Sequence, residues 1–160
     1  MREWIQKATK LKGSFAEIGL GLGLTTVELL RTGKTVYGVD PFEEGWNEMP
    51  KSYGMPYRYE QFEEAIEPYK DNFKLHKNTS LCSSAEDFLK IPLALAYVDG
   101  LQYKGAVLND LRIVSHAKII IVDDYNRESG ISEVPKGIEE YLKHNKRKLI
   151  IEDRWAILIK

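Results

Sequence analysis

The sequence has little cysteine and no long apolar run. Cys82 is the only cysteine among 160 residues, so no internal disulfide can form and a reducing compartment is expected. No apolar run reaches the roughly 18 residues that a membrane span requires, and no signal peptide precedes the first charged residues. We therefore expect a cytoplasmic protein that has no membrane partner.

An excess of charge of either sign is also missing. The formal net charge is −1, from 23 basic and 24 acidic residues, so no overall field attracts nucleic acid. We interpret the one dense basic run, residues 143–148, as a solvated loop. The 3 histidines are scattered along the chain, and neither zinc-ligand spacing nor a Ser-His-Asp set is visible.

What the chain does contain is a regular alternation of strand and helix patterns. Strands are predicted at 14–18, 35–39, 73–78, 93–98, 118–122, 148–152 and 154–159. Helices are predicted at 1–12, 24–31, 61–69, 104–115 and 137–144, with another that ends at 89 and is capped by Ser83 or Ser84. Such alternation favours one α/β domain over residues 1–160: a three-layer sandwich around a mostly parallel, Rossmann-like seven-stranded sheet with an antiparallel C-terminal strand.

The most informative motif is a glycine turn after the first predicted strand. Three glycines alternate with apolar residues (Gly19, Gly21 and Gly23), and a helical pattern follows them. The second predicted strand ends in Asp40. Glycines let the backbone approach a ligand, and an acid at this place accepts hydrogen bonds from ribose hydroxyls, so the unit predicts a nucleoside site.

Two details favour a nucleoside that carries an amino acid over a dinucleotide. Leu24 stands where the dinucleotide fingerprint requires its last glycine. Glu17 lies within the strand, two residues before the first glycine, where a carboxylate would repel a pyrophosphate but suits an amino group. An NAD-dependent oxidoreductase is therefore the less favoured alternative, and a tight turn without a ligand is another.

This set of motifs resembles the cofactor site of class I S-adenosylmethionine-dependent methyltransferases. Within that superfamily it is most similar to small-molecule O-methyltransferases of the catechol and macrocin type. The similarity extends through Tyr97-Val98-Asp99-Gly100, through residues 105–111 and through residues 119–125. It implies the fold predicted above, S-adenosylmethionine as methyl donor and a small-molecule acceptor.

The resemblance also implies roles for individual residues. The three glycines would pass beneath the methionine portion, and Thr25 would meet its carboxylate. Asp40 would hold the ribose hydroxyls. Pro41 and Phe42 would lie beside the adenine, and Ser84 and Ala85 would contact its edge, although a plain helix cap is an equal interpretation of Ser84. The implied cofactor-binding set is Glu17, Gly19, Gly21, Gly23, Thr25, Asp40, Pro41, Phe42, Ser84, Ala85 and Asp99.

Three acids follow two apolar strands at the edge of the sheet where ligands bind in α/β folds. They are Asp99, Asp123 and Asp124. Gathered there, they repel one another unless a cation or a shared proton intervenes. Oxygen ligands without cysteine or histidine favour Mg²⁺ or Ca²⁺, and in catechol-type relatives acids at these places hold Mg²⁺. The alternative is that Asp99 orients a ligand while the other two cap a turn.

The general base is the point of departure from the related enzymes. Gln102 stands where a histidine is common, and an amide cannot take a proton. We therefore name Asp99 and Lys104 as the catalytic candidates, with a solvated lysine as the simpler interpretation of Lys104. The missing base also keeps open a catalytically silent cofactor-binding or scaffold protein.

A long aromatic-rich insertion is predicted at about 41–59. Its large side chains have the composition of a lid or substrate wall, and they suit equally a sheet-edge cover or a contact in a homodimer. They are Trp46, Met49, Tyr53, Met55, Tyr57 and Tyr59. The sequence thus predicts a methyltransferase, with magnesium, the acceptor and the oligomeric state left open.

Overall fold

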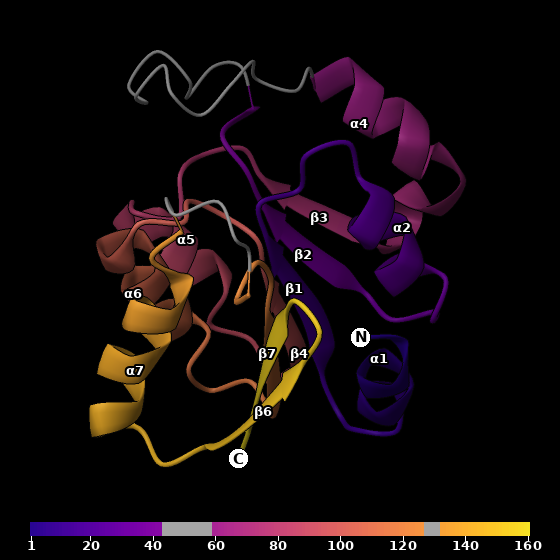
Figure 1. Ribbon diagram of the computed structural model, residues 1–160. Helices are drawn as coiled ribbons and strands as arrows, with labels where there is room; N and C mark the ends of the chain where they lie inside the picture. Colours follow the sequence, from indigo (N-terminus) through magenta and orange to yellow (C-terminus); the bar gives the residue numbers. More distant parts are fainter. Residues whose placement is uncertain (43–58, 127–131) are drawn as a thin grey trace.

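The computed structural model describes residues 1–42, 59–126 and 132–160. In these ranges it contains a seven-stranded sheet flanked by helices on both faces (Figure 1). The strands are β1 (Ser14–Ile18), β2 (Val36–Val39), β3 (Phe73–His76), β4 (Leu93–Val98), β5 (Ile119–Val122), β6 (Lys148–Glu152) and β7 (Trp155–Ile159). The helices are α1 (Arg2–Thr9), α2 (Leu24–Leu30), α4 (Tyr59–Ile66), the 3₁₀ helix η3 (Glu67–Asn72), α5 (Ser83–Phe88), α6 (Lys104–Ile113) and α7 (Val134–His144).

The strand order confirms the predicted topology. The sheet runs β3-β2-β1-β4-β5-β7-β6, and every neighbouring pair from β3 to β5 is parallel. Strand β7 pairs antiparallel with both β5 and β6, so it lies between them and leaves β6 at the edge. The order reverses between β1 and β4, which is the switch point where open α/β sheets bind ligands at the carboxyl ends of the strands.

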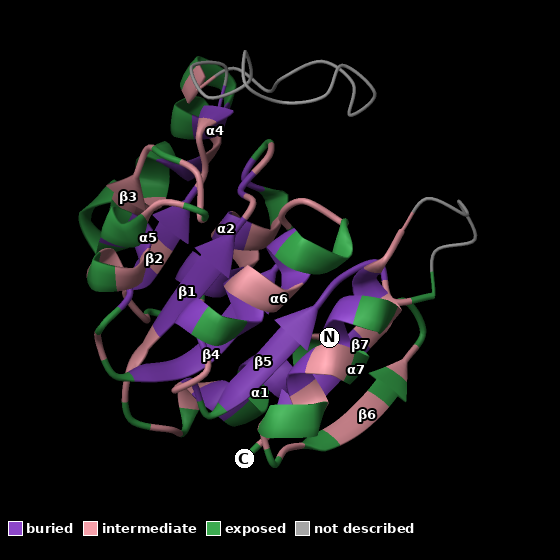
Figure 2. Cartoon of the chain, turned by 90° about the vertical axis from the view of Figure 1, so that its left-hand side faces the viewer, coloured by how far each residue is buried: buried purple, intermediate pink, exposed green. Residues whose placement is uncertain are grey.

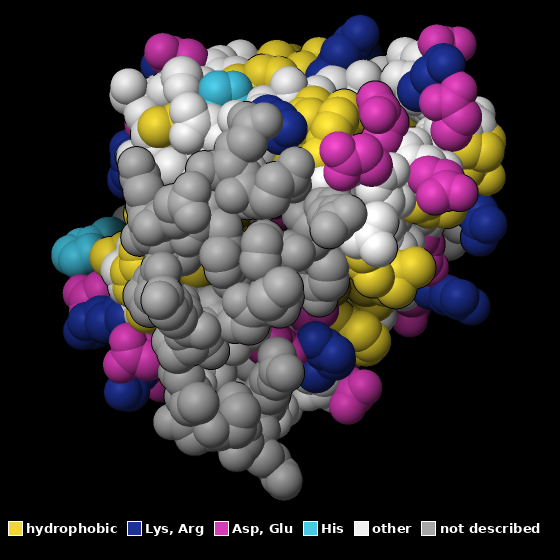
Figure 3. Space-filling view, turned by 90° about the horizontal axis from the view of Figure 1, so that it is seen from above, with side chains coloured by type: hydrophobic (Ala, Val, Ile, Leu, Met, Phe, Trp, Pro, Cys, Tyr) yellow, Lys and Arg dark blue, Asp and Glu magenta, His cyan; other side chains and the backbone are white. Residues whose placement is uncertain are grey.

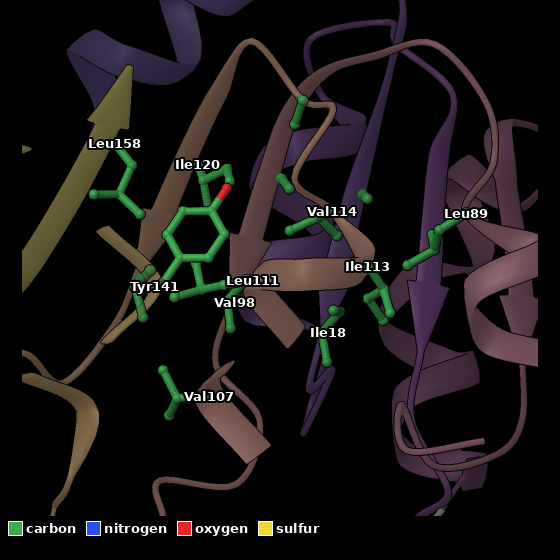
Figure 4. Close-up of a cluster of buried hydrophobic side chains, with 14 of the residues drawn as sticks. Ile18, Leu89, Val98, Val107, Leu111, Ile113, Val114, Ile120, Tyr141 and Leu158 are labelled. Carbon is green, nitrogen blue, oxygen red and sulfur yellow. The ribbon is translucent and has the colours of Figure 1, made fainter. Parts of the chain in front are cut away.

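The central strands are buried on both faces because helices cover both. All residues of β4 and β5 are buried, as the continuous apolar runs predict (Figure 2). Helices α5, α6 and α7 pack on one face, and α1, α2 and α4 pack on the other. Figure 4 shows the first of these clusters, with the ring of Tyr141 from α7 close to Leu111 and Ile120.

Most predicted boundaries are confirmed within a few residues, and two expectations are wrong. The helix expected at 61–69 stops at Ile66, and η3 with Pro68 near its start follows, because an α-helix rarely continues through the residue before a proline. The expected serine cap of the helix ending near 89 is absent: Cys82 is its N-cap, no side chain caps it, and Ser83 and Ser84 lie inside the first turn.

None of the described helices is long and apolar enough to cross a membrane. The parallel strands β1 to β5 all end at the same edge of the sheet, which is uppermost in Figure 1. Figure 3 looks down on this edge, where acidic and basic side chains both reach the surface.

Candidate functional site

A cavity of about 460 Å³ lies at the switch point, over the carboxyl ends of β1, β2, β4 and β5. Its volume falls within the range of roughly 300–1,000 Å³ that is usual for small-molecule sites. Four acids and one base are among the described residues that line it. The polar side chains that line it include Glu17, Asp40, Thr79, Ser80, Asp99, Gln102, Asp124 and Arg154.

The glycine turn at the end of β1 is held by Asp40 at the tip of β2. One carboxylate oxygen accepts the backbone N–H of Leu20 at 2.8 Å and that of Gly21 at 3.4 Å. The other accepts the N–H of Phe42 at 2.6 Å. Asp40 therefore holds the glycine turn and the start of the loop after β2 in place. The same hydrogen bonds fix the orientation of its carboxylate, whose remaining lone pairs can accept hydrogen bonds from a ligand.

Gly19 permits the closest backbone contact in the site. Its φ is +84°, and a Cβ at this position would lie 2.1 Å from the carbonyl oxygen of Asp99. The loop after β1 and the loop after β4 thus touch at a place where only glycine fits. Gly23 is not among the lining residues: it is the N-cap of α2, at φ +81°, with the Phe62 ring beside it.

Glu17 is a buried carboxyl group on the wall of the cavity. It is 1% exposed, and its Oε2 has no hydrogen-bond partner among the described residues. Burial raises the pKa of Glu17 well above its usual range, and the charges of Asp99 and Asp40 add to this, while the Thr26 hydroxyl acts in the opposite direction. A buried carboxyl oxygen that lacks a hydrogen-bond partner can accept a hydrogen bond from a cationic group of a ligand.

Of the three acids predicted to hold a metal, Asp99 and Asp124 line the cavity together with Arg154, whereas Asp123 lies behind it in contact with the guanidinium. The guanidinium Nε contacts Asp123 Oδ1 at 2.5 Å, and Nη2 contacts Asp124 Oδ1 at 2.5 Å. Within the described ranges, no three or more His, Cys, Asp or Glu side chains are arranged to hold a metal ion. The expected set of Asp99, Asp123 and Asp124 therefore does not fit a metal in this structure, because an arginine supplies the positive charge.

The two catalytic candidates are not brought together. Asp99 is exposed and lines the cavity. The Nζ of Lys104 pairs with Glu140 of α7 at 3.1 Å, and Lys104 is not among the lining residues. Gln102, in the position where a base was sought, donates its amide to Asp124.

Most of the residues expected to contact a cofactor line the cavity, and three, Gly23, Ser84 and Ala85, do not. Gly19, Gly21, Thr25, Asp40, Pro41, Phe42 and Asp99 all line the cavity together with Glu17. Ser84 and Ala85 do not: the Ser84 hydroxyl lies 3.2 Å from His76 Nε2, and Ala85 is fully buried in the core. Their place at the cavity is taken by Thr79 and Ser80, which follow β3.

Sequence reasoning missed Thr79, Ser80 and Arg154. A signal existed for the first two, since they follow a parallel strand and must therefore come to the carboxyl edge of the sheet. No local signal identifies Arg154, because its partners lie 30 and 31 residues earlier in the chain. The aromatic insertion lies mostly outside the described residues, and only Tyr59 of its large side chains is placed, with its ring against Phe42.

Comparisons with known proteins bear on the fold. No protein-family model matches the chain, and no curated protein matches its sequence. Solved structures do match: CalS11, a TDP-rhamnose 3′-O-methyltransferase of calicheamicin biosynthesis, has a TM-score of 0.74 and 14% identity over 98% of this chain and 75% of that one.

Two further neighbours show how widely this architecture is used. An rRNA methylase from Streptococcus thermophilus has a TM-score of 0.65 and 12% identity over 98% of this chain and 90% of that one. Magnesium protoporphyrin IX methyltransferase from Synechocystis PCC 6803, solved with bound SAM, has a TM-score of 0.61 and 17% identity over 98% of this chain and 74% of that one. The chain therefore has the fold of class I S-adenosylmethionine-dependent methyltransferases, as its motifs predict.

Proposed function

We propose that this chain transfers a methyl group from S-adenosylmethionine to a hydroxyl group of a small molecule. The observation that carries the proposal is the cavity at the switch point, where the glycine turn, Asp40 and the buried Glu17 meet. S-Adenosylmethionine combines a ribose with an ammonium group and a sulfonium cation. A cavity with four acids and one base among its described lining residues favours such a cation over an anionic cofactor.

The lining residues suit the parts of this cofactor one by one. An ammonium group beside Glu17 would give the unpartnered Oε2 a donor and favour its charged form. Ribose hydroxyls would donate to Asp40, whose oxygens have lone pairs beyond those that the turn uses. Phe42 is buried just after β2 and offers an apolar surface to the adenine ring of the cofactor.

The reaction then requires that the acceptor oxygen is held in line with the methyl group and that its proton is removed. A lone pair of the acceptor oxygen forms a bond to the methyl carbon, and the carbon–sulfur bond breaks with its electrons going to sulfur, which leaves as a neutral thioether. The acceptor O–H proton passes to the carboxylate of Asp99, which lines the cavity and is exposed, so that it can release the proton to water. No step of this proposal uses a metal.

The charge of the site argues against the alternatives. An NAD pyrophosphate would lie over the glycine turn, beside the carboxyl group of Glu17. The position of the last fingerprint glycine is occupied by Leu24, whose side chain is 80% exposed. An RNA acceptor, as the rRNA methylase has, would bring phosphates to an edge lined by acids, with Arg154 as the one described base.

The test is a methyl-transfer screen with the purified chain. S-Adenosylmethionine carrying a labelled methyl group is incubated with panels of phenols, sugar hydroxyls, amines and total RNA, and S-adenosylhomocysteine formation is measured with and without each panel. We expect turnover that depends on a hydroxylated small molecule and an O-methyl product by mass spectrometry. Label found only in amines or RNA would refute the acceptor class, and the absence of any cofactor binding would refute the proposal itself.

A further inference from the structure

The end of the cavity around Arg154, which we take as the acceptor end under the proposed function, contains an ion-pair network. Arg154 lies at the turn between β6 and β7 and contacts both acids that follow β5. Burial disfavours the charged guanidinium, but the charges of Asp123, Asp124 and Asp99 outweigh this and raise the pKa of Arg154. Two of the three acids predicted to share a cation, Asp123 and Asp124, therefore do share one, and it is the side chain of Arg154.

The carboxylate oxygens of this network are already engaged by donors from the protein. Asp123 Oδ1 also accepts the backbone N–H of Asp124 at 2.7 Å, and Asp123 Oδ2 accepts the Tyr97 hydroxyl at 2.6 Å. Asp124 Oδ2 accepts the amide of Gln102. A divalent ion would have to displace these hydrogen-bond donors, and it would also be repelled by the positive charge of the neighbouring guanidinium. Both effects disfavour metal binding at this place.

Burial makes the charge of Arg154 necessary. The side chains of Asp123 and Asp124 are 8% and 4% exposed, whereas that of Arg154 is 48% exposed and reaches the cavity. Two nearly buried carboxylates without a counter-ion are strongly unfavourable. Removing the guanidinium therefore takes away the cation that both nearly buried acids contact, and another cation would restore the balance of charge.

We propose that Arg154 is a built-in substitute for a divalent cation, which fixes Asp123 and Asp124 at the acceptor end of the cavity and makes this site independent of metal. Arg154 is a positioning residue in this account. The catalytic consequence, turnover that chelators leave unchanged, rests on the proposed function. The cation-binding consequence does not rest on it, since it follows from the network alone.

The experiment measures Mn²⁺ binding to the full chain by the electron paramagnetic resonance of free Mn²⁺. The variants are Arg154→Met, Arg154→Gln as a second neutral replacement, and Arg154→Lys, which keeps the charge. Arg112→Met is the matched control, because Arg112 pairs with Glu86 on the outside of the molecule. S-Adenosylhomocysteine binding and circular dichroism report for each variant whether the cavity and the fold persist.

We expect no saturable Mn²⁺ binding in the millimolar range by the wild type, Arg154→Lys or Arg112→Met. Arg154→Met and Arg154→Gln should gain a site that is tighter by at least about tenfold, because the uncompensated carboxylates are hard oxygen ligands. Adding Asp124→Asn should abolish the gained site.

Two results would overturn the proposal. One is wild-type Mn²⁺ binding that Asp124→Asn abolishes, and this result stands even if every Arg154 variant fails to fold. The other is a folded Arg154→Met or Arg154→Gln variant that binds Mn²⁺ no better than the wild type. If the wild type binds no S-adenosylhomocysteine, the proposed function fails, while the Mn²⁺ comparison still decides the role of Arg154.

Discussion

Replacing Gly19 by alanine should damage the cavity far more than the same change at Gly33. Both glycines are in the left-handed region, at φ +84° and +79°, so alanine incurs about 1–2 kcal/mol of backbone strain at either site. At Gly33 nothing lies within 4 Å of the added Cβ, and the cost ends there. Gly33→Ala is therefore a matched control for strain alone.

At Gly19 the added Cβ would also meet backbone that has little freedom to move. It would lie 2.1 Å from the Asp99 carbonyl oxygen and 2.9 Å from the Gly100 nitrogen. Both sides are tied to the sheet, by a hydrogen bond from Gly19 N to Val39 O at 3.0 Å and one from Asp99 N to Ile18 O at 2.8 Å. Overpacking of this kind adds about 1–3 kcal/mol, which brings the expected total to about 2–5 kcal/mol.

The assay is thermal unfolding of the two variants beside the wild type, followed by S-adenosylhomocysteine titration at low temperature. For a chain of this size each 1 kcal/mol lowers Tm by about 2–4 °C, so Gly33→Ala should lose a few degrees and Gly19→Ala clearly more. Gly19→Ala should also bind the ligand at least about tenfold more weakly, since the displaced loops line the cavity. Equal losses of Tm in the two variants, with ligand binding retained in both, would refute the reasoning.

Two further predictions concern buried polar groups in α6 and α7, the helices that pack on the same face of the sheet as α5. Burial raises the pKa of Asp110 to about 7 from 3.8, with Ser80 and Asn109 opposing the shift, so the folded state favours the protonated form. Stability should therefore fall by up to about 4 kcal/mol as pH rises from about 4 to about 7, and Asp110→Asn should remove this slope in urea unfolding; parallel pH profiles would contradict it. The Tyr141 hydroxyl is buried without a partner among the described residues, so Tyr141→Phe should leave the free energy of unfolding unchanged or raise it by about 1 kcal/mol, and a clear loss would show a missed partner.

The sequence predicts the sheet well because its signals are local. The bounds of β1, β4 and β6 agree with the runs 14–18, 93–98 and 148–152, since apolar strands next to glycine, proline or charged residues define their own ends. The strand-helix-strand unit that carries the glycine turn and Asp40 also forms as expected, and Gly19, Gly21 and Asp40 line the cavity. Pro68 was a signal for the end of α4 that the expected helix at 61–69 overlooked.

What the sequence could not predict are contacts between distant segments. Three acids at one sheet edge indicate that a cation is needed, but a metal and an arginine satisfy the need equally well. The choice depends on the hairpin of β6 and β7, whose pairing with β5 places Arg154 against Asp123. Ser84 and Ala85 were assigned by resemblance alone, and the α5 helix turns them toward His76 and the core.

The central claim is that the cavity at the switch point binds S-adenosylmethionine through Asp40 and Glu17. Calorimetric titration with S-adenosylhomocysteine tests it most directly, on the wild type, Asp40→Asn and Asp40→Ala, with NAD as the competing ligand and circular dichroism to check each fold. We predict saturable binding by the wild type that NAD does not displace, and a loss of roughly 100-fold or more in Asp40→Ala, as two hydrogen bonds to a charged group are removed. Absence of wild-type binding, or equal affinity in a folded Asp40→Ala variant, would contradict the account.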